Sequence, residues 1–250
     1  MKLTILGSGT MVPTKKRYPS SYLLDAGSSR MLLDCGPLTL ARLVEHAVPF
    51  REIEAVCITH FHTDHFAGLF PLVHALWVDN KVTKRQDIPL TVMGPKTTEE
   101  RWKKLREVFW PEPSESFPLH VREAPVQETV GSLSIESFAV KHVPWFLSVG
   151  YRIRSGGKML VYTGDIGSDH PMEDLVERVK GADLLLIEAG GTKPSPNHFT
   201  IEQILKLQDE AGVKRVIATH IREQNLPLIQ SKISGRKNVT IAEDGMVVEL

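Results

Sequence analysis

The feature that most constrains this chain is a dense cluster of metal-ligand side chains directly after a short apolar run. Residues 55–58 read Ala-Val-Cys-Ile, and His60, His62, Asp64 and His65 follow at once. A strand that ended at His60 would point His60 and His62 to the same side, because side chains alternate along a strand. Asp64 and His65 lie just beyond and could serve a second ion. A fold that uses these residues must bring further ligands to the end of this strand.

A single histidine is most often a satisfied core or surface residue. Four ligand-type side chains at this spacing favour a metal site instead. Without a cation, crowding them would cost desolvation, and like-charge repulsion once an imidazole is protonated. Imidazole nitrogens and carboxylate oxygens suit zinc, manganese and iron alike, so the metal stays open at this point.

Composition narrows the class of protein. At 250 residues and 42% hydrophobic content, the chain has enough apolar material for one α/β domain over residues 1–250. Thirty basic and thirty acidic residues balance, which excludes a global positive field that binds nucleic acid indiscriminately. We therefore expect no stable nucleic-acid partner, and any contact with nucleic acid must be local.

Cysteine usage and apolar runs indicate the compartment. Cys35 and Cys57 are too few for a disulfide framework, and we interpret both as buried, reduced thiols. The N-terminus lacks the apolar segment of a signal peptide, and no run approaches the roughly 20 apolar residues needed to span a bilayer. A soluble, cytoplasmic protein without membrane contact is predicted.

Hydrophobic periodicity predicts strands and helices in alternation. We expect strands at residues 2–6, 21–25, 30–34, 53–59, 90–93, 119–122, 126–130, 133–139, 149–153, 158–163, 184–187, 215–218 and 247–250. The strands from residue 119 to residue 153 are expected to be antiparallel. Helices are expected at residues 38–47, 69–78, 97–110, 173–179, 200–210 and 226–234. Thr200 and Gln203 are spaced as a capping box at the start of one of them. The pattern predicts two sheets flanked by helices.

Three more ligand-type residues follow predicted strands. His142 comes after residues 133–139, Asp165 after residues 158–163, and His220 after residues 215–218. Strand ends are where partners for the first cluster should be found, so these residues complete a candidate site.

This ordered set resembles the HxHxDH signature of the metallo-β-lactamase superfamily, which continues with a lone histidine, an aspartate after a strand and a final histidine. The resemblance covers essentially the whole chain and implies a four-layer αββα sandwich. Within the superfamily the chain most resembles ribonuclease Z, an endonuclease, and its phosphodiesterase relatives. The segments that carry this likeness are residues 6–10, 12–13, 20–21, 33–36, 187–189, 197–200 and 219–221.

The resemblance implies two divalent metal ions, which we expect to be zinc, with manganese or iron as alternatives. One ion would be held by His60, His62 and His142, the other by Asp64, His65 and His220, with Asp165 bridging. Two cations about 3.5–4 Å apart can share a hydroxide of lowered pKa and stabilise both the entering and the leaving oxygen of a phosphoryl group.

His198 is left over once these ligands are assigned. From its position alone it could be a capping or core histidine beside Thr200. The resemblance implies instead a general acid that protonates the leaving alkoxide, with Glu188 holding its tautomer. Asp64, His198 and Glu188 form the predicted catalytic set.

Other residues leave alternatives open. Asp34 and Thr59 could orient ligand imidazoles, although Asp34 could equally form a turn. Basic side chains at residues 15–17 and on the helix at 97–110 could touch phosphate or simply be solvated. Trp145 and Phe146 follow His142 closely, and at least one could line the pocket and stack on a base. The remaining histidines have no partner in sequence, and we interpret them as surface or packing residues: His46, His74, His120 and His170.

The chain departs from ribonuclease Z in one respect. That family usually carries a transfer-RNA-gripping arm between the lone histidine and the bridging aspartate, whereas only residues 143–164 lie between them here. We therefore expect a phosphodiesterase acting through a metal-bridging hydroxide on a small diester, such as a cyclic nucleotide or a short RNA end. The alternatives are a hydrolase of carboxylic or sulfate esters, of the lactonase or arylsulfatase type, and a non-catalytic metal- or nucleotide-binding protein. Relatives are commonly dimers, so the resemblance also implies a homodimer.

Overall fold

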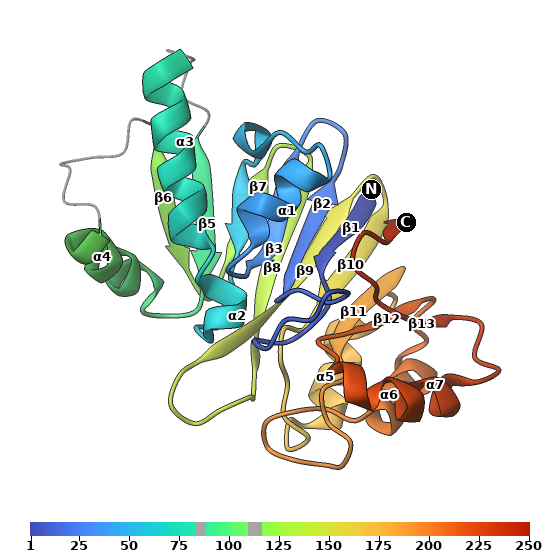
Figure 1. The fold of residues 1–250 in the computed structure, drawn as a ribbon. Coiled ribbons are helices and arrows are strands. Elements are labelled where there is room, and N and C mark those ends of the chain that lie inside the picture. Colours follow the sequence, from blue (N-terminus) through green and yellow to red (C-terminus); the bar gives the residue numbers. More distant parts are fainter. Residues whose placement is uncertain (84–88, 110–116) are drawn as a thin grey trace.

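The computed structural model describes residues 1–83, 89–109 and 117–250. Two seven-stranded sheets face each other, and helices cover the outer face of each (Figure 1). This arrangement confirms the predicted four-layer αββα sandwich.

The first sheet combines an antiparallel and a parallel half. Its strands, in spatial order, are β14 (Val247–Glu249), β1 (Lys2–Gly7), β2 (Ser21–Asp25), β3 (Arg30–Cys35), β4 (Ala55–Cys57), β5 (Leu90–Gly94) and β6 (Leu119–Glu123). Pairing is antiparallel from β14 to β3 and parallel from β3 to β6. The C-terminal strand thus lies beside the first strand of the chain.

The second sheet repeats this division. Its strands, in spatial order, are β13 (Val239–Ile241), β12 (Val216–Thr219), β11 (Leu184–Glu188), β10 (Lys158–Tyr162), β9 (Ser148–Ser155), β8 (Leu133–Val140) and β7 (Gln127–Val130). Pairing is parallel from β13 to β10 and antiparallel from β10 to β7. Loops that leave the parallel strands therefore meet at one edge of the sandwich, where ligands commonly bind in such sheets.

Helices flank the two sheets and connect their strands. They are α1 (Thr39–Glu45), α2 (Thr63–Phe66), α3 (Leu69–Thr83), α4 (Thr98–Phe109), α5 (Met172–Val179), α6 (Ile201–Ala211) and α7 (Leu226–Ile233), with short 3-10 turns η1 (Phe50–Glu52) and η2 (Glu223–Asn225). The predicted capping box is confirmed at α6. The Thr200 side chain accepts from the Gln203 N–H, and the Gln203 side chain accepts from the Thr200 N–H.

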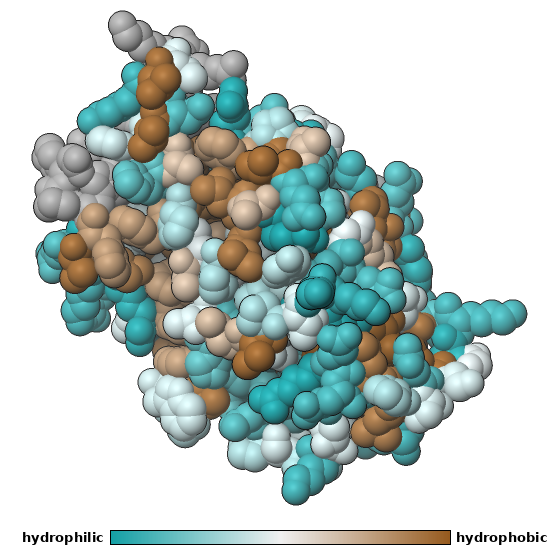
Figure 2. Space-filling model, viewed as in Figure 1, coloured by the Kyte–Doolittle hydropathy of each residue, from teal (hydrophilic) through white to brown (hydrophobic). Residues whose placement is uncertain are grey.

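Apolar side chains fill three layers. The central one lies between the sheets and includes the fully buried Tyr22 and Tyr151. A second layer packs the second sheet against α5, α6 and α7, and a third packs the first sheet against α1 and α3. On the surface, hydrophobic side chains gather over α3 and α4, at the upper left of Figure 2.

Two expectations about the strands were wrong, and one strand was missed. The strand expected at residues 53–59 is shorter than predicted and forms only β4, Ala55–Cys57. The chain leaves the sheet after Cys57 and continues as the loop that carries the ligands. The strand near residue 119 pairs in parallel with β5, since α4 carries the chain back across the sheet before β6 begins. The three-residue β13 was missed because so short a run shows no clear alternation. The helix predicted to reach residue 110 is described up to Phe109, and residue 110 lies outside the described residues.

Within residues 1–83, 89–109 and 117–250, no helix combines the length and apolar character needed to cross a membrane.

Candidate metal centre

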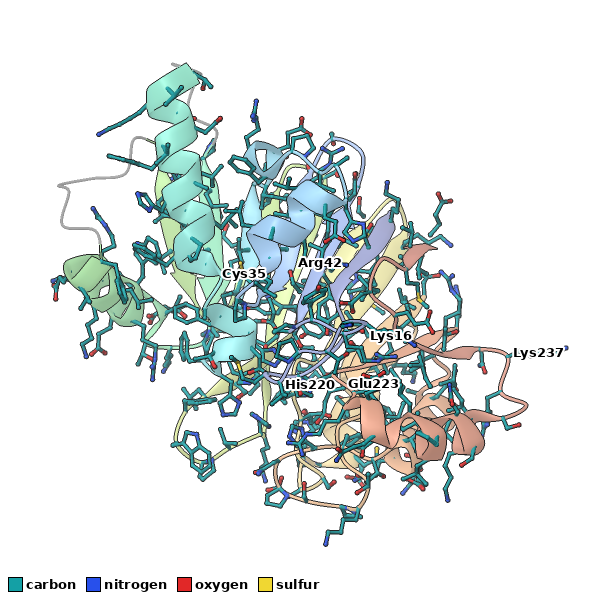
Figure 3. The ribbon with its side chains drawn as sticks, viewed as in Figure 1. Lys16, Cys35, Arg42, His220, Glu223 and Lys237 are labelled. Atoms are coloured by element: carbon teal, nitrogen blue, oxygen red, sulfur yellow. The ribbon has the colours of Figure 1, made fainter. Side chains whose placement is uncertain are left out.

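Strand ends bring the predicted ligands together at one edge of the sandwich. His60 and His62 follow β4, and α2 carries Asp64 and His65. The other three come from the second sheet, after β8, β10 and β12: His142, Asp165 and His220. His220 lies at the lower edge of the sheets in Figure 3.

The predicted ligands form two groups, and a third group of Asp165, His198 and His220 shares Asp165 with the first and His220 with the second. In the first group, atoms of His60, His62, His142 and Asp165 all lie within 4.8 Å of one another. The second group contains Asp64, His65 and His220 under the same limit. Asp165 lies between them: its Oδ2 is 3.8 Å from His142 Nε2 and 3.5 Å from His220 Nε2, and its Oδ1 is 3.5 Å from His65 Nε2.

The loop after β4 places its ligands differently from the sequence prediction. His60 and His62 are not strand residues, so strand alternation does not bring them together; the chain turns after Cys57, and His62 is the N-cap residue of α2. Their ring centroids are nevertheless 4.8 Å apart. Two glycines hold this loop close to β3. The Gly68 N–H donates to the Cys35 carbonyl, and a Cβ at Gly68 would collide with the Gly36 carbonyl oxygen.

His65 and His142 each have their Nδ1 occupied by a hydrogen bond, which leaves their Nε2 facing the centre. His65 Nδ1 donates to Asp34 Oδ2 at 2.6 Å, and His142 Nδ1 donates to the Asn197 carbonyl at 2.7 Å. His65 Nε2 and Asp165 Oδ1 are buried and have no hydrogen-bond partner among the described residues. Unpartnered buried acceptors are costly unless a cation lies between them, so the donor set fits divalent metal ions.

Asp34 organises the buried side of the centre. Its carboxylate accepts from the Thr59 N–H at 2.7 Å, from the Tyr162 hydroxyl at 2.6 Å and from His65. Its φ of 54° is uncommon for a non-glycine residue, and such conformations cluster at functional sites. Asp34 therefore orients a ligand imidazole, whereas the turn interpretation is wrong, because Asp34 lies within β3 where the register with β2 shifts. Thr59 contributes too, since its Oγ1 lies 3.0 Å from His60 Nδ1.

Tyr162 was missed in the sequence. The available signal was its position at the end of a predicted strand, just before Thr163-Gly164-Asp165. A buried phenol needs a partner, and Asp34 is the one it finds, 128 residues away. Nothing in local sequence connects the two.

Electrostatics keep the carboxylates ionised and most of the imidazoles neutral. Burial, reinforced by the neighbouring His65, lowers the pKa of His60 well below its ordinary value. Burial works against the charge on Asp64, but the hydrogen bond from His220 and the charge of His65 lower its pKa to about 2. Burial likewise opposes protonation of His65, yet Asp165 and Asp34 raise its pKa well above the usual range. Ionised carboxylates and neutral imidazoles are the forms that bind metals, so Asp64 and His60 are already in the binding form, whereas His65 releases its Nε2 proton when an ion binds.

His198 and Glu188 form a pair beside the ligand groups. His198 Nδ1 lies 3.1 Å from Glu188 Oε1, and its ring stacks on His220 with centroids 5.5 Å apart. Glu188 is buried at the end of β11 and also accepts from the Phe199 N–H at 2.9 Å. Burial alone would lower the pKa of His198, but Glu188 and Asp165 raise it to about 9. The imidazole can therefore carry a proton at neutral pH and present it from Nε2.

Several expectations about peripheral residues change. Arg17 is buried and donates to the Ser8 hydroxyl and the Ala242 carbonyl, so it braces the N-terminal loop and is not free to meet a phosphate. His170 is not without partners. It accepts from the Lys141 N–H at 3.2 Å, and its Nε2 lies 3.3 Å from Asp174.

The other three histidines outside the centre are packing or surface residues. His46 contacts Arg42, and His74 packs against Trp77, whereas His120 is exposed. Cys35 and Cys57 are both buried and free, as predicted.

A pocket of about 700 Å³ opens beside His142. Trp145, Phe146 and Leu147 line it, together with Asn197, which precedes His198. Both aromatic residues named in the sequence analysis therefore contribute to its wall. Asp169, which also lines it, was missed because its sequence context is an ordinary turn.

Comparison with known proteins agrees with this geometry. The sequence model of the family described as "Beta-lactamase superfamily domain" matches residues 29–221. Ribonuclease Z of Archaeoglobus fulgidus is 26% identical over 311 residues, covering 100% of this chain and 97% of that protein.

Solved structures extend the comparison. The metallo-beta-lactamase fold protein YhfI from Bacillus subtilis has a TM-score of 0.82 at 25% identity, covering 100% of this chain and 99% of its own. The short form of human tRNase Z has a TM-score of 0.80 at 22% identity, with the same coverage. The chain thus belongs to the metallo-β-lactamase superfamily and is a metal-dependent hydrolase related to ribonuclease Z.

Proposed function

We propose that this hydrolase is a dinuclear phosphodiesterase that cleaves small diesters, such as cyclic nucleotides or short RNA ends. The observation that carries the proposal is the His198–Glu188 pair, held at 3.1 Å and stacked on His220. A diester releases an alkoxide, which is a poor leaving group unless it is protonated as it departs. The relationship to proteins named ribonuclease Z supports the same substrate class.

In this proposal the two ligand groups hold two divalent ions, zinc being the first choice. His60, His62 and His142 would bind one, Asp64, His65 and His220 the other, and Asp165 would contact both. When bound, such a pair activates water and offsets negative charge on phosphoryl oxygens. Asp165 is suited to the shared position because its Oδ2 faces His142 of the first set at 3.8 Å and its Oδ1 faces His65 of the second set at 3.5 Å.

The chain's own groups then divide the remaining work. Glu188 accepts from His198 Nδ1 and fixes the ring, so that Nε2 carries the proton toward the leaving oxygen. The Oδ2 atom of Asp64 lies 3.2 Å from His220 Nε2, so the negative charge of Asp64 is held beside the imidazole of His220. Arg222 is exposed, forms no ion pair with a described residue, and acts electrostatically on His198. Its guanidinium is available to a non-bridging phosphate oxygen.

A small substrate follows from the chain between His142 and Asp165. Strands β9 and β10 and their turn occupy most of it, which leaves no length for a protruding arm. The alignment with the Archaeoglobus protein extends over 311 residues, whereas this chain has 250, so that relative carries segments that this one lacks.

One panel of measurements tests the proposal. Elemental analysis of purified protein should find about two metals per chain, as a two-metal site requires. The loaded protein should then hydrolyse bis(p-nitrophenyl) phosphate and cyclic nucleotides. Turnover of only a lactone or an aryl sulfate would replace the phosphodiesterase by an ester or sulfate hydrolase. Bound metal without turnover of any of these would indicate a binding protein.

A further inference from the structure

Residues 141–147, between β8 and β9, expose large apolar side chains next to the metal centre. Trp145 and Leu147 are 66% and 60% exposed, although neighbouring core residues of their size are buried. The loop begins at the proposed ligand His142. Exposed hydrophobic side chains that line a hollow beside a site commonly meet a ligand there.

The loop is tied to the ligand cluster by Phe146. Its ring centroid lies 4.9 Å from that of His62 and 5.7 Å from that of His60. Phe146 therefore shields the ligand imidazoles on the side that faces the pocket, while Trp145 projects beyond it. Any molecule in this pocket lies against the same loop that supplies a ligand.

The pocket also lies close to the proton donor, because the ring of His142 in its wall has its centroid 5.6 Å from that of His198. Asn197 lines its wall, and the next residue is His198. His142 and Asn197 lie side by side in this wall, with His142 Nδ1 2.7 Å from the Asn197 carbonyl oxygen, so a phosphate at the metal centre can have one substituent in the pocket. The pocket volume of about 700 Å³ is ample for a planar heterocycle. Lys141 and Asp169 add a charged donor and an acceptor that suit the polar edge of such a ring.

We propose that this pocket is a nucleobase subsite, in which a base stacks on Trp145 while its nucleotide phosphate lies at the metal centre. The position of the phosphate rests on the proposed function; the stacking rests on the pocket itself. A base fits better than an alkyl chain, because it uses both the aromatic face and the two charged groups at the wall.

Binding measurements test the subsite without requiring turnover. Isothermal titration of zinc-loaded protein with AMP and with ribose 5-phosphate compares ligands that share a phosphate and a sugar. Stacking of one base corresponds to roughly a five- to 150-fold difference in affinity, and we expect AMP to bind tighter by that factor. Trp145→Ala should abolish the difference, whereas Trp145→Phe should retain most of it.

A matched control comes from α4. Phe109 is a similarly exposed aromatic residue, 65% exposed, and it lies outside the pocket. Phe109→Ala should leave the AMP to ribose 5-phosphate ratio unchanged. Metal content is measured for every variant, so that loss of an ion is not mistaken for loss of stacking.

The outcomes separate this subsite from the proposed function. Equal affinities in the parent protein, a ratio unaffected by Trp145→Ala, or hexyl phosphate binding as tightly as AMP would each overturn the subsite. Diester hydrolysis could persist in all three cases. Conversely, a base preference that disappears in Trp145→Ala, in a protein that cleaves no diester, would support the subsite and refute the phosphodiesterase.

Discussion

The metal centre has two sides that are built in opposite ways. On the closed side, Asp34, Thr59 and His65 are fully buried, and each forms hydrogen bonds to at least one of the others. On the open side, His198 keeps 27% of its side chain exposed and Trp145 far more. The closed side has little freedom to move and can hold ligands in register; the open side leaves polar atoms and aromatic faces available to a substrate. Substitutions on the open side should therefore lower turnover, whereas substitutions on the closed side should lower metal affinity.

The largest effect should come from the open side. His198→Ala removes the proposed proton donor, and kcat for a diester with an alkoxide leaving group should fall by about 10²–10⁴-fold. Metal content should stay at the parent level, because His198 belongs to neither proposed ligand set, although one of its ring nitrogens lies within 4.8 Å of ligand atoms of Asp165 and His220. Steady-state kinetics together with elemental analysis decide the matter. A variant that lost its metal, or that kept its full rate, would show that His198 has another role.

The closed side should respond through metal affinity. Asp34→Asn keeps a side chain that tolerates positive φ but removes the charge that His65 Nδ1 faces. Loss of such a supporting group typically lowers metal affinity by about 10–100-fold. Competition with a chelator of known affinity measures it. If His198→Ala and Asp34→Asn gave the same pattern of kcat and metal loss, the distinction between the two sides would be wrong.

A matched pair of tyrosines sharpens the comparison through stability. Tyr162 and Tyr22 are both fully buried, but Tyr162 donates to the Asp34 carboxylate, whereas Tyr22 contacts the neutral Thr219 hydroxyl at 2.9 Å. A bond to a charged group contributes about 1.5–3 kcal/mol and a neutral one about 0.5–1.5 kcal/mol. Tyr162→Phe should thus lower the free energy of unfolding more than Tyr22→Phe in urea titrations. Equal losses would mean that the charge on Asp34 is already balanced by its other donors.

The smallest expected effect depends on pH. In metal-free protein the pKa of His198 is raised to about 9, above its ordinary value of 6.5. The folded protein therefore binds the His198 proton more tightly than the unfolded chain does. The His198–Glu188 pair stabilises the fold fully below about pH 6.5, and this stabilisation is lost as pH rises through about 9. Glu188→Gln should lower the unfolding temperature more near pH 6 than near pH 10, measured in a chelator. A loss independent of pH would assign the effect of Glu188 to its backbone hydrogen bonds alone.

Sequence alone predicted the parts of the centre that are local or regular. The histidine cluster, the strand ends at His142, Asp165 and His220, and the capping box at Thr200 all depend on spacing within a few residues. The structure brings those residues to one place because parallel strands end at the same edge of a sheet. Residue type and periodicity were sufficient for this step.

Residue type and periodicity could not predict contacts between residues far apart in the chain. The bond from Tyr162 to Asp34 and the burial of Arg17 under Ala242 join positions far apart in the chain. The direction of β6 depended on recognising α4 as a crossover, which periodicity does not encode. The single domain, the homodimer and the cytoplasmic location stay predictions.

The close approach of Gly68 to Gly36 has a consequence for anyone who redesigns this enzyme. A side chain at either position would push the loop with Asp64 and His65 away from β3, although neither glycine touches an ion or a substrate. Trp145 and Leu147, by contrast, line the pocket and are largely exposed, whereas Val143 is buried and Phe146 packs against His60 and His62. A variant library should therefore hold both glycines and Phe146 constant and diversify Trp145 and Leu147, which would yield catalysts with altered selectivity that still load their metals.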